Sequence, residues 1–391
     1  MATKLATRMD RLGTETAFEV LVRAKALEAQ GKEVIHLEIG EPDFDTPANI
    51  VDAACNALHA GWTHYGPAAG QPELKEAIAA YINRSRGTAY TAEQVVVTPG
   101  GKPIMFFLIL ALVEAGDEAI YPDPGFPIYR SMIDFTGATA VPIPLREEHD
   151  FRLDVDELAS LITPRTKLLI LNSPANPTGG VLERTDLEAI ARLAVEHDIL
   201  VLADEIYSEL LYEGEHVSIA TMPGMAERTV ILDGFSKTYA MTGWRLGYGL
   251  FPGDLAAVVS KLMVNSVSCT AVALQQAGIE ALTGPQEKVV EFREAFRRRR
   301  DLIVDGLNAI PGISCLSPKG AFYAFPNITG TGIKSKPFAD LLLEEHGVAA
   351  LSGTAFGAAG EGYLRLSYAN SEENLSKALE RIDAAVKATA G

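Results

Sequence analysis

The sequence predicts an α/β fold with two parts: a large domain whose mostly parallel central sheet is covered by helices on both faces, and a smaller α+β domain. Between residues 94 and 250, short apolar runs alternate with helix-like segments, which is typical of buried parallel strands. The length of 391 residues exceeds one ordinary hydrophobic core and indicates two domains. We expect the large domain at 46–284 and the small domain at 285–391. Residues 1–45 would form an N-terminal arm and part of the small domain.

The first elements are expected in the order helix, strand, helix, helix. A polar arm precedes a helix at Thr16–Ala29, which Gly31 ends, and a short strand follows at Val34–Ile39. Two further helices begin at Pro47 and Pro72, because proline is favoured in the first turn of a helix.

Strands and helices then alternate through the rest of the large domain. The expected strands are Gln94–Val97, Glu118–Tyr121, Thr139–Leu145, Lys167–Asn172, Leu200–Ala203, Thr229–Leu232 and Leu246–Leu250. The helices between them are Lys102–Glu114, Ile128–Thr136, Asp154–Leu161 and Arg184–His197. In the small domain a long helix at 286–309 precedes helices at Lys336–His346 and Glu372–Thr389, with strands at Ile313–Leu316, Ala321–Phe325, Val348–Leu351 and Tyr363–Ser367.

Composition and charge narrow the class of protein. Apolar residues make up 48% and charged residues 22%, and the net charge of −17 argues against binding to nucleic acid or to an anionic membrane. Cys55, Cys269 and Cys315 are too few and too widely spaced for a disulfide framework or a zinc site, so we expect no metal and a cytoplasmic location. Met1–Leu12 is too polar for a signal peptide, and the longest apolar run, Ile104–Val113, is about half a membrane span.

The segment from Asp233 to Arg245 contains the strongest catalytic candidate. It follows an expected strand and places Lys237 among aromatic, methyl-bearing and hydroxyl side chains. A lysine shielded from water has a lowered pKa, so its neutral amine can attack a carbonyl and form a Schiff base. Taken alone, the same pattern also fits a solvated lysine in a surface turn.

The ends of the other strands support the catalytic interpretation, because ligands of open α/β sheets bind beyond the carboxyl ends of the strands. One strand runs into Gly100-Gly101-Lys102 at the start of a helix, which is suited to an anion. The segments after the other strands offer an aromatic ring, an amide, a carboxylate and a phenol, on Phe126, Asn176, Asp204 and Tyr207. Pro174 and Pro177 around this amide would include cis bonds that make its turn rigid.

One ligand uses all of these groups. Pyridoxal phosphate needs an amine for its aldehyde, an anion cup for its phosphate and a carboxylate at its ring nitrogen. It also needs donors at its phenolate oxygen and an aromatic ring to stack on. The candidates for these roles are, in the same order, Lys237, Gly100 and Gly101 with Arg245, Asp204, Asn176 with Tyr207, and Phe126.

The sequence resembles the class I aminotransferases, which are pyridoxal-phosphate enzymes of fold type I, over nearly its whole length. The motifs that carry the resemblance are Gly40-Glu41-Pro42-Asp43-Phe44, His64-Tyr65-Gly66, Asn172 to Gly179, Asp204-Glu205-Ile206-Tyr207, Ser236-Lys237 to Leu246-Gly247, and Arg365-Leu366-Ser367. The resemblance implies the fold-type I architecture, in which the large domain binds the cofactor.

The resemblance also implies roles for single residues. Lys237 would be the Schiff-base lysine and proton carrier, Asp204 would pair with the ring nitrogen, and Asn176 and Tyr207 would bind the phenolate oxygen. Phe126 would stack, while Gly101, Lys102, Ser236 and Arg245 would lie at or near the phosphate. Arg365 would bind the substrate α-carboxylate, as arginine geometry allows, with help from Asn176 and Gly40. Tyr65 would reach the phosphate in a neighbouring subunit, so a homodimer with shared active sites is expected.

The implied reaction is a ping-pong transamination between an L-amino acid and a 2-oxo acid. The bacterial aspartate aminotransferase subgroup is similar, and in it the positions of Lys102 and Thr16 bind the distal carboxylate, which favours aspartate with 2-oxoglutarate or pyruvate. Two positions depart from the pattern of the family. Many relatives have tryptophan where this chain has Phe126, and a hydroxyl side chain where it has Gly234. An aminotransferase for an aromatic, neutral or basic amino acid and a carbon–sulfur β-lyase stay open as alternatives. A non-catalytic regulator would need a DNA-binding module that the N-terminal arm is too short to supply.

Overall fold

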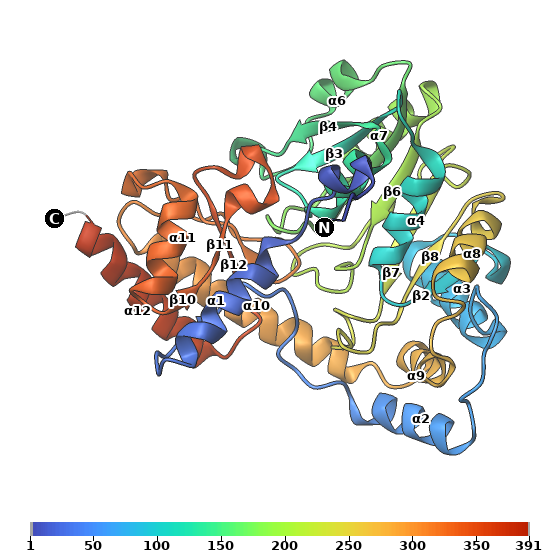
Figure 1. The fold of residues 1–391 in the computed structure, drawn as a ribbon, viewed down its shortest axis with the longest axis horizontal. Helices are drawn as coiled ribbons and strands as arrows, with labels where there is room; N and C mark the ends of the chain where they lie inside the picture. The colour runs from blue at the N-terminus through green and yellow to red at the C-terminus, as the bar shows by residue number, and fades with distance from the viewer. Residues whose placement is uncertain (1–2, 390–391) are drawn as a thin grey trace.

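The computed structural model describes residues 3–389, and a seven-stranded sheet forms its centre (Figure 1). In spatial order the strands are β2 (Val95–Thr98), β8 (Gly247–Leu250), β7 (Thr229–Gly234), β6 (Leu200–Asp204), β5 (Thr166–Asn172), β3 (Glu118–Asp123) and β4 (Thr139–Pro144). Only β8 runs antiparallel to its neighbours. The predicted, mostly parallel sheet is therefore confirmed.

Helices cover both faces of this sheet, because alternate residues of each buried strand point to opposite sides. Leu168 and Ile170 of β5 pack with one group of helices and Leu169 and Leu171 with another. The first face is covered by α4 (Lys102–Leu112), α5 (Ile128–Thr136) and α8 (Leu255–Ser266). The second is covered by α2 (Ala48–His59), α3 (Pro72–Arg86), α7 (Arg184–Glu196) and α9 (Val272–Thr283), while α6 (Val155–Leu161) packs beside α7.

The C-terminal part surrounds a smaller antiparallel sheet. Its order is β11 (Leu351–Ser352), β12 (Leu364–Ser367) and β9 (Tyr323–Ala324), and a separate strand, β1 (Ile35–His36), pairs in parallel with β10 (Val348–Ala349). The helices here are α1 (Thr16–Glu28), α10 (Glu287–Asn308), α11 (Ser335–Glu344) and α12 (Glu372–Thr389). The β1–β10 pair places the N-terminal segment beside the C-terminal strands, while the domain limits at 45 and 284 stay a prediction.

Two details differ from the sequence prediction. The expected strand at 313–316 is absent, since Ser314 forms only an isolated bridge with Asn327 beside the close contact of Gly312 and Gly330. No helix was expected between 251 and 284, yet α8 and α9 lie there. Buried residues on several sides of α9 leave it without a clear polar face, so periodicity is a weak signal for it.

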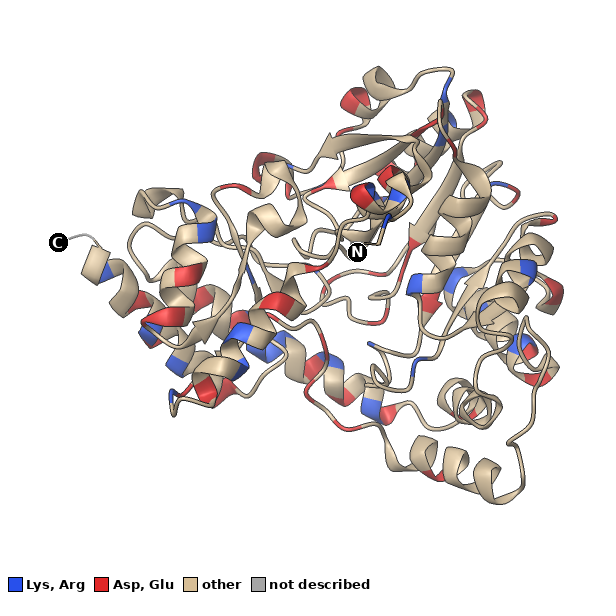
Figure 2. Cartoon of the chain, viewed as in Figure 1, with Lys and Arg blue, Asp and Glu red and all other residues tan. Residues whose placement is uncertain are grey.

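The exposed faces of the outer helices carry mixed charges (Figure 2). Lys336 pairs with Asp340 on α11, and Lys377 with Glu373 on α12, each at a spacing of four residues that stabilises a helix by a few tenths of a kcal/mol. Among residues 3–389, no helix is both long enough and apolar enough to cross a membrane.

Candidate active site

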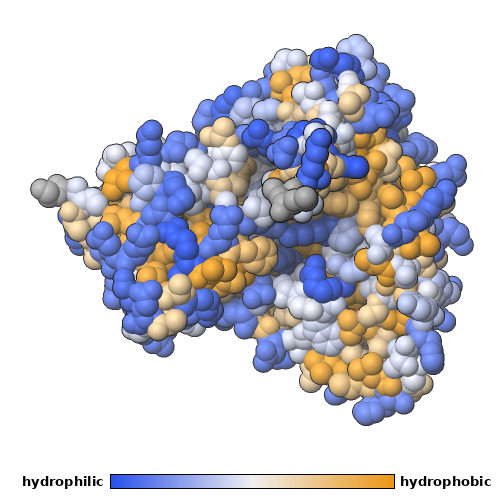
Figure 3. Space-filling view, in the orientation of Figure 1, coloured by the Kyte–Doolittle hydropathy of each residue, from blue (hydrophilic) through white to orange (hydrophobic). Residues whose placement is uncertain are grey.

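A cavity of about 900 Å³ opens between the carboxyl ends of the large sheet, the loop after β1 and the small sheet. The space-filling view shows a hollow between the two lobes of the molecule (Figure 3). The sequence-predicted site residues that line this cavity are Thr16, Gly40, Gly101, Lys102, Phe126, Asn176, Asp204, Tyr207, Ser236, Lys237, Arg245 and Arg365. Gly100 and Tyr65 are not in this lining, although Gly100 lies against Arg245, which is.

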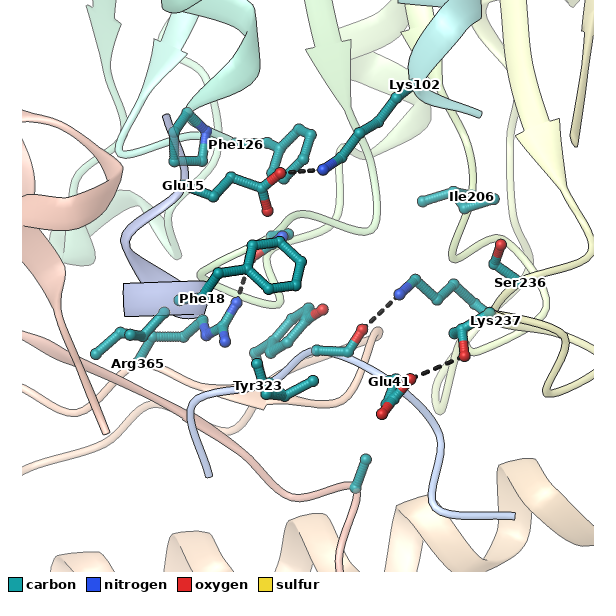
Figure 4. A pocket seen from close by; sticks show the side chains of 18 of the residues that line it. Glu15, Phe18, Glu41, Lys102, Phe126, Ile206, Ser236, Lys237, Tyr323 and Arg365 are labelled. Carbon is teal, nitrogen blue, oxygen red and sulfur yellow. Dashed lines mark hydrogen bonds and ion pairs between the residues drawn. The ribbon is translucent and has the colours of Figure 1, made fainter. Parts of the chain in front are cut away.

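Lys237 projects into the cavity from the turn that follows β7. Its Nζ donates a hydrogen bond of 2.5 Å to the carbonyl oxygen of Gly40 (Figure 4). The same Nζ lies 5.7 Å from the ring centre of Phe322. Burial lowers the pKa of Lys237 to about 8, although the charge of Glu41 opposes this shift. Roughly a tenth of this amine is therefore neutral and nucleophilic at pH 7, and about half of it at pH 8.

Asp204 ends β6 and lies deep in the cavity wall. Its Oδ2 accepts a hydrogen bond of 2.5 Å from the hydroxyl of Tyr129, a fully buried residue of α5. Burial raises the pKa of Asp204 to about 6, while the Tyr129 hydrogen bond works in the opposite direction. A carboxylate in this environment favours a cationic partner, since a cation would stabilise its charged form.

The Asn176 turn and Tyr207 line the neighbouring wall. The peptide bonds before Pro174 and Pro177 are both cis, as the sequence predicts, and so is the bond before Pro124. The backbone N–H of Asn176 donates to Asn172 Oδ1 at 2.8 Å, and the hydroxyls of Tyr207 and Tyr323 lie 2.7 Å apart. Asn176 and Tyr207 both line the cavity.

Arg365 enters the opposite side of the cavity from β12. The guanidinium lies 4.6 Å from the ring centre of Tyr323, approaches Asn176 Oδ1 at 3.5 Å and donates to the carbonyl oxygen of Glu38. Its buried Nε has no hydrogen-bond partner within residues 3–389. Burial lowers the pKa of Arg365, but an arginine stays charged, so this side chain is a buried cation with an unused donor.

Gly100 and Arg245 form a compact corner at the start of α4. Gly100 has φ +86°, and a Cβ at this position would lie 2.2 Å from Arg245 Nη2. Gly101 is the residue that precedes α4, so the free N–H groups of the first turn face the same corner. A helix N-terminus beside a guanidinium is suited to a phosphate group.

Lys102 does not stand alone at the mouth of the cavity. It forms an ion pair with Glu15, and its Nζ lies 5.5 Å from the ring centre of Phe126 and 5.8 Å from that of Phe18 (Figure 4). Thr16 begins α1 next to Glu15 and also lines the cavity. Glu15 and Phe18 have no place in the sequence prediction, because nothing in the local pattern shows that the N-terminal segment crosses the mouth.

Tyr65 and Gly234 do not line the cavity. Tyr65 is 90% exposed and contacts none of the cavity groups, so its expected role depends on a second subunit. A Cβ on Gly234 would lie 3.1 Å from Gly247 Cα, so a side chain at this position would require a small shift of the neighbouring strand. Ser236 lines the cavity two residues later and is the nearest hydroxyl along the chain.

A buried ionic network lies behind Asp204 and Lys237. Arg86 of α3 donates to Glu205 Oε2 at 3.0 Å, to Asp233 Oδ2 at 2.8 Å and to Ser208 at 2.5 Å. Burial alone would raise the pKa of Glu205, yet His216, 3.1 Å away, and Arg86 together lower it to about 2. This network holds the ends of β6 and β7 together, and the sequence prediction did not include it.

Comparison with known proteins agrees with this geometry. The family model described as aminotransferase class I and II matches residues 32–382. The chain is 44% identical to an aspartate aminotransferase of Pyrococcus abyssi, covering 90% of this chain and 91% of that one. It is 43% identical to an arginine–pyruvate transaminase of Pseudomonas aeruginosa, covering 94% and 93%. The structure of the Thermus thermophilus aspartate aminotransferase with maleate matches with a TM-score of 0.94 at 42% identity, covering 98% of this chain and 100% of the other.

Proposed function

We propose that this chain, which belongs to the class I and II aminotransferases, uses pyridoxal 5′-phosphate to transfer the amino group of L-aspartate to 2-oxoglutarate or pyruvate. The reaction would be a ping-pong exchange, with a first half-reaction for the donor and a second for the acceptor. One observation carries the proposal: the amine of Lys237, with its lowered pKa, shares one cavity with the buried carboxylate of Asp204 and the buried guanidinium of Arg365.

The residues present fit the cofactor. Gly100 leaves space where a Cβ would strike Arg245, which supports this corner as the phosphate site, together with Gly101, Lys102 and Ser236. Asp204, held by Tyr129, would keep the ring nitrogen protonated, and Phe126 would stack on the ring. When bound, pyridoxal phosphate supplies an aldehyde for an amine and a ring that withdraws electrons from the substrate Cα.

The other residues would position the substrate and move its proton. Arg365 would bind the α-carboxylate through its unused Nε, beside Asn176 and the Gly40 backbone. The neutral Nζ of Lys237 would take the proton from the substrate Cα and return it to the product. Asn176 and Tyr207 would donate to the phenolate oxygen of the cofactor, and Lys102 with Thr16 would meet a distal carboxylate.

Aspartate is the first choice of donor because relatives from several organisms bear the name aspartate aminotransferase. Other relatives are an arginine–pyruvate transaminase and an aromatic-amino-acid aminotransferase, which supports basic or aromatic donors as the second candidate. The residues that would bind the cofactor and the α-carboxylate serve any of these amino donors. The preference among donors therefore depends on the residues at the mouth of the cavity.

The assembly would be a homodimer with shared active sites. Tyr65 supports this assignment, because the family resemblance gives it a role at a neighbouring subunit's phosphate and it is 90% exposed, outside the cavity of its own chain. The three cysteines are all free thiols, which supports a reducing, cytoplasmic compartment.

A screen of amino donors against 2-oxoglutarate and pyruvate tests the proposal. We expect turnover with aspartate at the highest kcat/KM, and loss of both turnover and the visible absorbance of bound cofactor in Lys237→Ala. Unimpaired turnover in that variant would contradict the role of Lys237. Release of pyruvate and ammonia from cystathionine, without any 2-oxo acid, would instead favour the β-lyase alternative.

A further inference from the structure

The mouth of the cavity contains a carboxylate that transamination itself does not require. Glu15 precedes the first residue of α1, but its side chain makes no capping hydrogen bond to the helix. The side chain is only 16% exposed and turns toward Lys102 across the mouth, as Figure 4 shows. A carboxylate withdrawn from water in this way needs a cationic partner.

The charge of Glu15 is directed at the interior of the cavity. Burial lowers the pKa of Lys237 and of Arg365, and the negative charge of Glu15 is among the groups that oppose both shifts. These two residues would bind the reacting end of an amino acid. Glu15 lines the same cavity beside Lys102, so we expect it to meet the far end of a substrate side chain.

A dicarboxylic substrate must compete with Glu15 for Lys102. Its distal carboxylate would have to draw Lys102 away from Glu15, and two carboxylates would then share one ammonium group. Like charges at close range oppose each other, most strongly where water is partly excluded. Binding of a distal carboxylate to Lys102 therefore carries the cost of breaking the Glu15–Lys102 pair.

A cationic side chain meets the opposite situation. Lys102 is 45% exposed and can turn into solvent, which leaves the carboxylate of Glu15 open to a substrate ammonium or guanidinium. The rings of Phe126 and Phe18 already face the Lys102 ammonium at 5.5 and 5.8 Å, a range in which aromatic faces attract cations. The cavity of about 900 Å³ also has room for a long side chain.

We propose that Glu15 is a specificity-determining residue that admits basic amino acids as donors, by binding their distal cation in place of Lys102. This inference rests on the proposed transaminase function and extends its substrate class. Lys102 and Glu15 would then form one subsite that binds two kinds of side chain. Lys102 would bind the distal carboxylate of an acidic substrate, and Glu15 the distal cation of a basic one.

The test compares Glu15→Gln with the matched control Glu19→Gln, an exposed glutamate one turn along α1 that does not line the cavity. The measured quantities are the kcat/KM values for L-arginine and L-aspartate, each divided by the value for L-alanine in the same variant. In Glu15→Gln we expect the arginine ratio to fall by about tenfold or more and the aspartate ratio to rise. Glu19→Gln should leave both ratios as in the parent enzyme.

One further variant and one binding measurement extend the test, and the binding measurement is independent of catalysis. Lys102→Gln should raise the arginine ratio and lower the aspartate ratio. The holoenzyme should also be titrated calorimetrically with α-methylornithine and α-methylaspartate, which lack the Cα proton and cannot be transaminated. Glu15→Gln should weaken binding of the first and not of the second.

The outcomes are distinguishable. An arginine ratio and an α-methylornithine affinity that are unchanged in Glu15→Gln, or that fall equally in Glu19→Gln, would overturn the assignment of Glu15. Absence of turnover with every donor would contradict the proposed function alone, because the calorimetric comparison would still report on Glu15.

Discussion

Replacing Arg86 with methionine should destabilise the protein strongly, although Arg86 lies outside the cavity. The substitution keeps a similar length but removes the cation that holds two buried carboxylates, Glu205 and Asp233. Removing one partner of a buried ion pair costs about 3–5 kcal/mol, because the remaining charge is left uncompensated. Burial raises the pKa of Asp233 to about 7, so at neutral pH the uncompensated charge falls mainly on Glu205, and we expect a loss of unfolding free energy within this range.

The expected loss depends on pH. The pKa of Glu205 is lowered to about 2 in the folded protein from an ordinary value of 4.5. A lowered pKa stabilises the folded state above the ordinary value, and this stabilisation is lost as the pH falls from 4.5 towards 2. Without Arg86, Glu205 can take up a proton more readily, so the gap between parent and variant should narrow as the pH is lowered.

Denaturant unfolding followed by far-UV circular dichroism, at neutral pH and at about pH 4.5, measures both effects. Arg84→Met is the matched control, because Arg84 lies on the same helix and is exposed, so its loss should cost no more than about 0.5 kcal/mol. If Arg86→Met proved as stable as Arg84→Met, the network would have no structural role. A gap that widened on acidification would refute the assigned charge states.

Two further predictions concern the cofactor site. Gly100→Ala should weaken the binding of pyridoxal phosphate to the apoenzyme about tenfold or more, because the new Cβ would displace Arg245. Gly61→Ala is the matched control: Gly61 has φ +85° and nothing within 4 Å, so the variant carries the same backbone strain and should bind the cofactor normally. The rate at which the apoenzyme recovers its visible absorbance should rise as the pH increases through about 8, since only the neutral amine of Lys237 is nucleophilic, and a rate independent of pH would contradict that origin.

Much of the cavity could be anticipated because parallel strands deliver their carboxyl ends to one edge. Asp204 ends β6 and Lys237 follows β7, and because these strands are neighbours in the sheet, their carboxyl ends place both residues at the same edge. Arg365 is different. No local pattern marks it, and only the resemblance of its motif to a known family assigned it to the site.

The remaining features depend on contacts between distant segments. Tyr129 sits in α5 with the pattern of an ordinary core residue, and nothing nearby in sequence indicates its hydrogen bond to Asp204. The pairing of Glu15 with Lys102 joins residues 87 positions apart, and that of Arg86 with Asp233 joins residues 147 apart. Such ion pairs follow from the way the chain crosses itself, which hydrophobic periodicity does not encode.

The position of Arg365 on the penultimate regular element has a consequence for biosynthesis. A ribosome has delivered every strand of the seven-stranded sheet, together with Lys237 and the Gly100 corner, by residue 250. The strand that carries Arg365 appears more than a hundred residues later, and it pairs with strands that also emerge late. Because N-terminal parts of a chain fold first during translation, a nascent chain would acquire the means to hold a cofactor before it could recognise an amino acid.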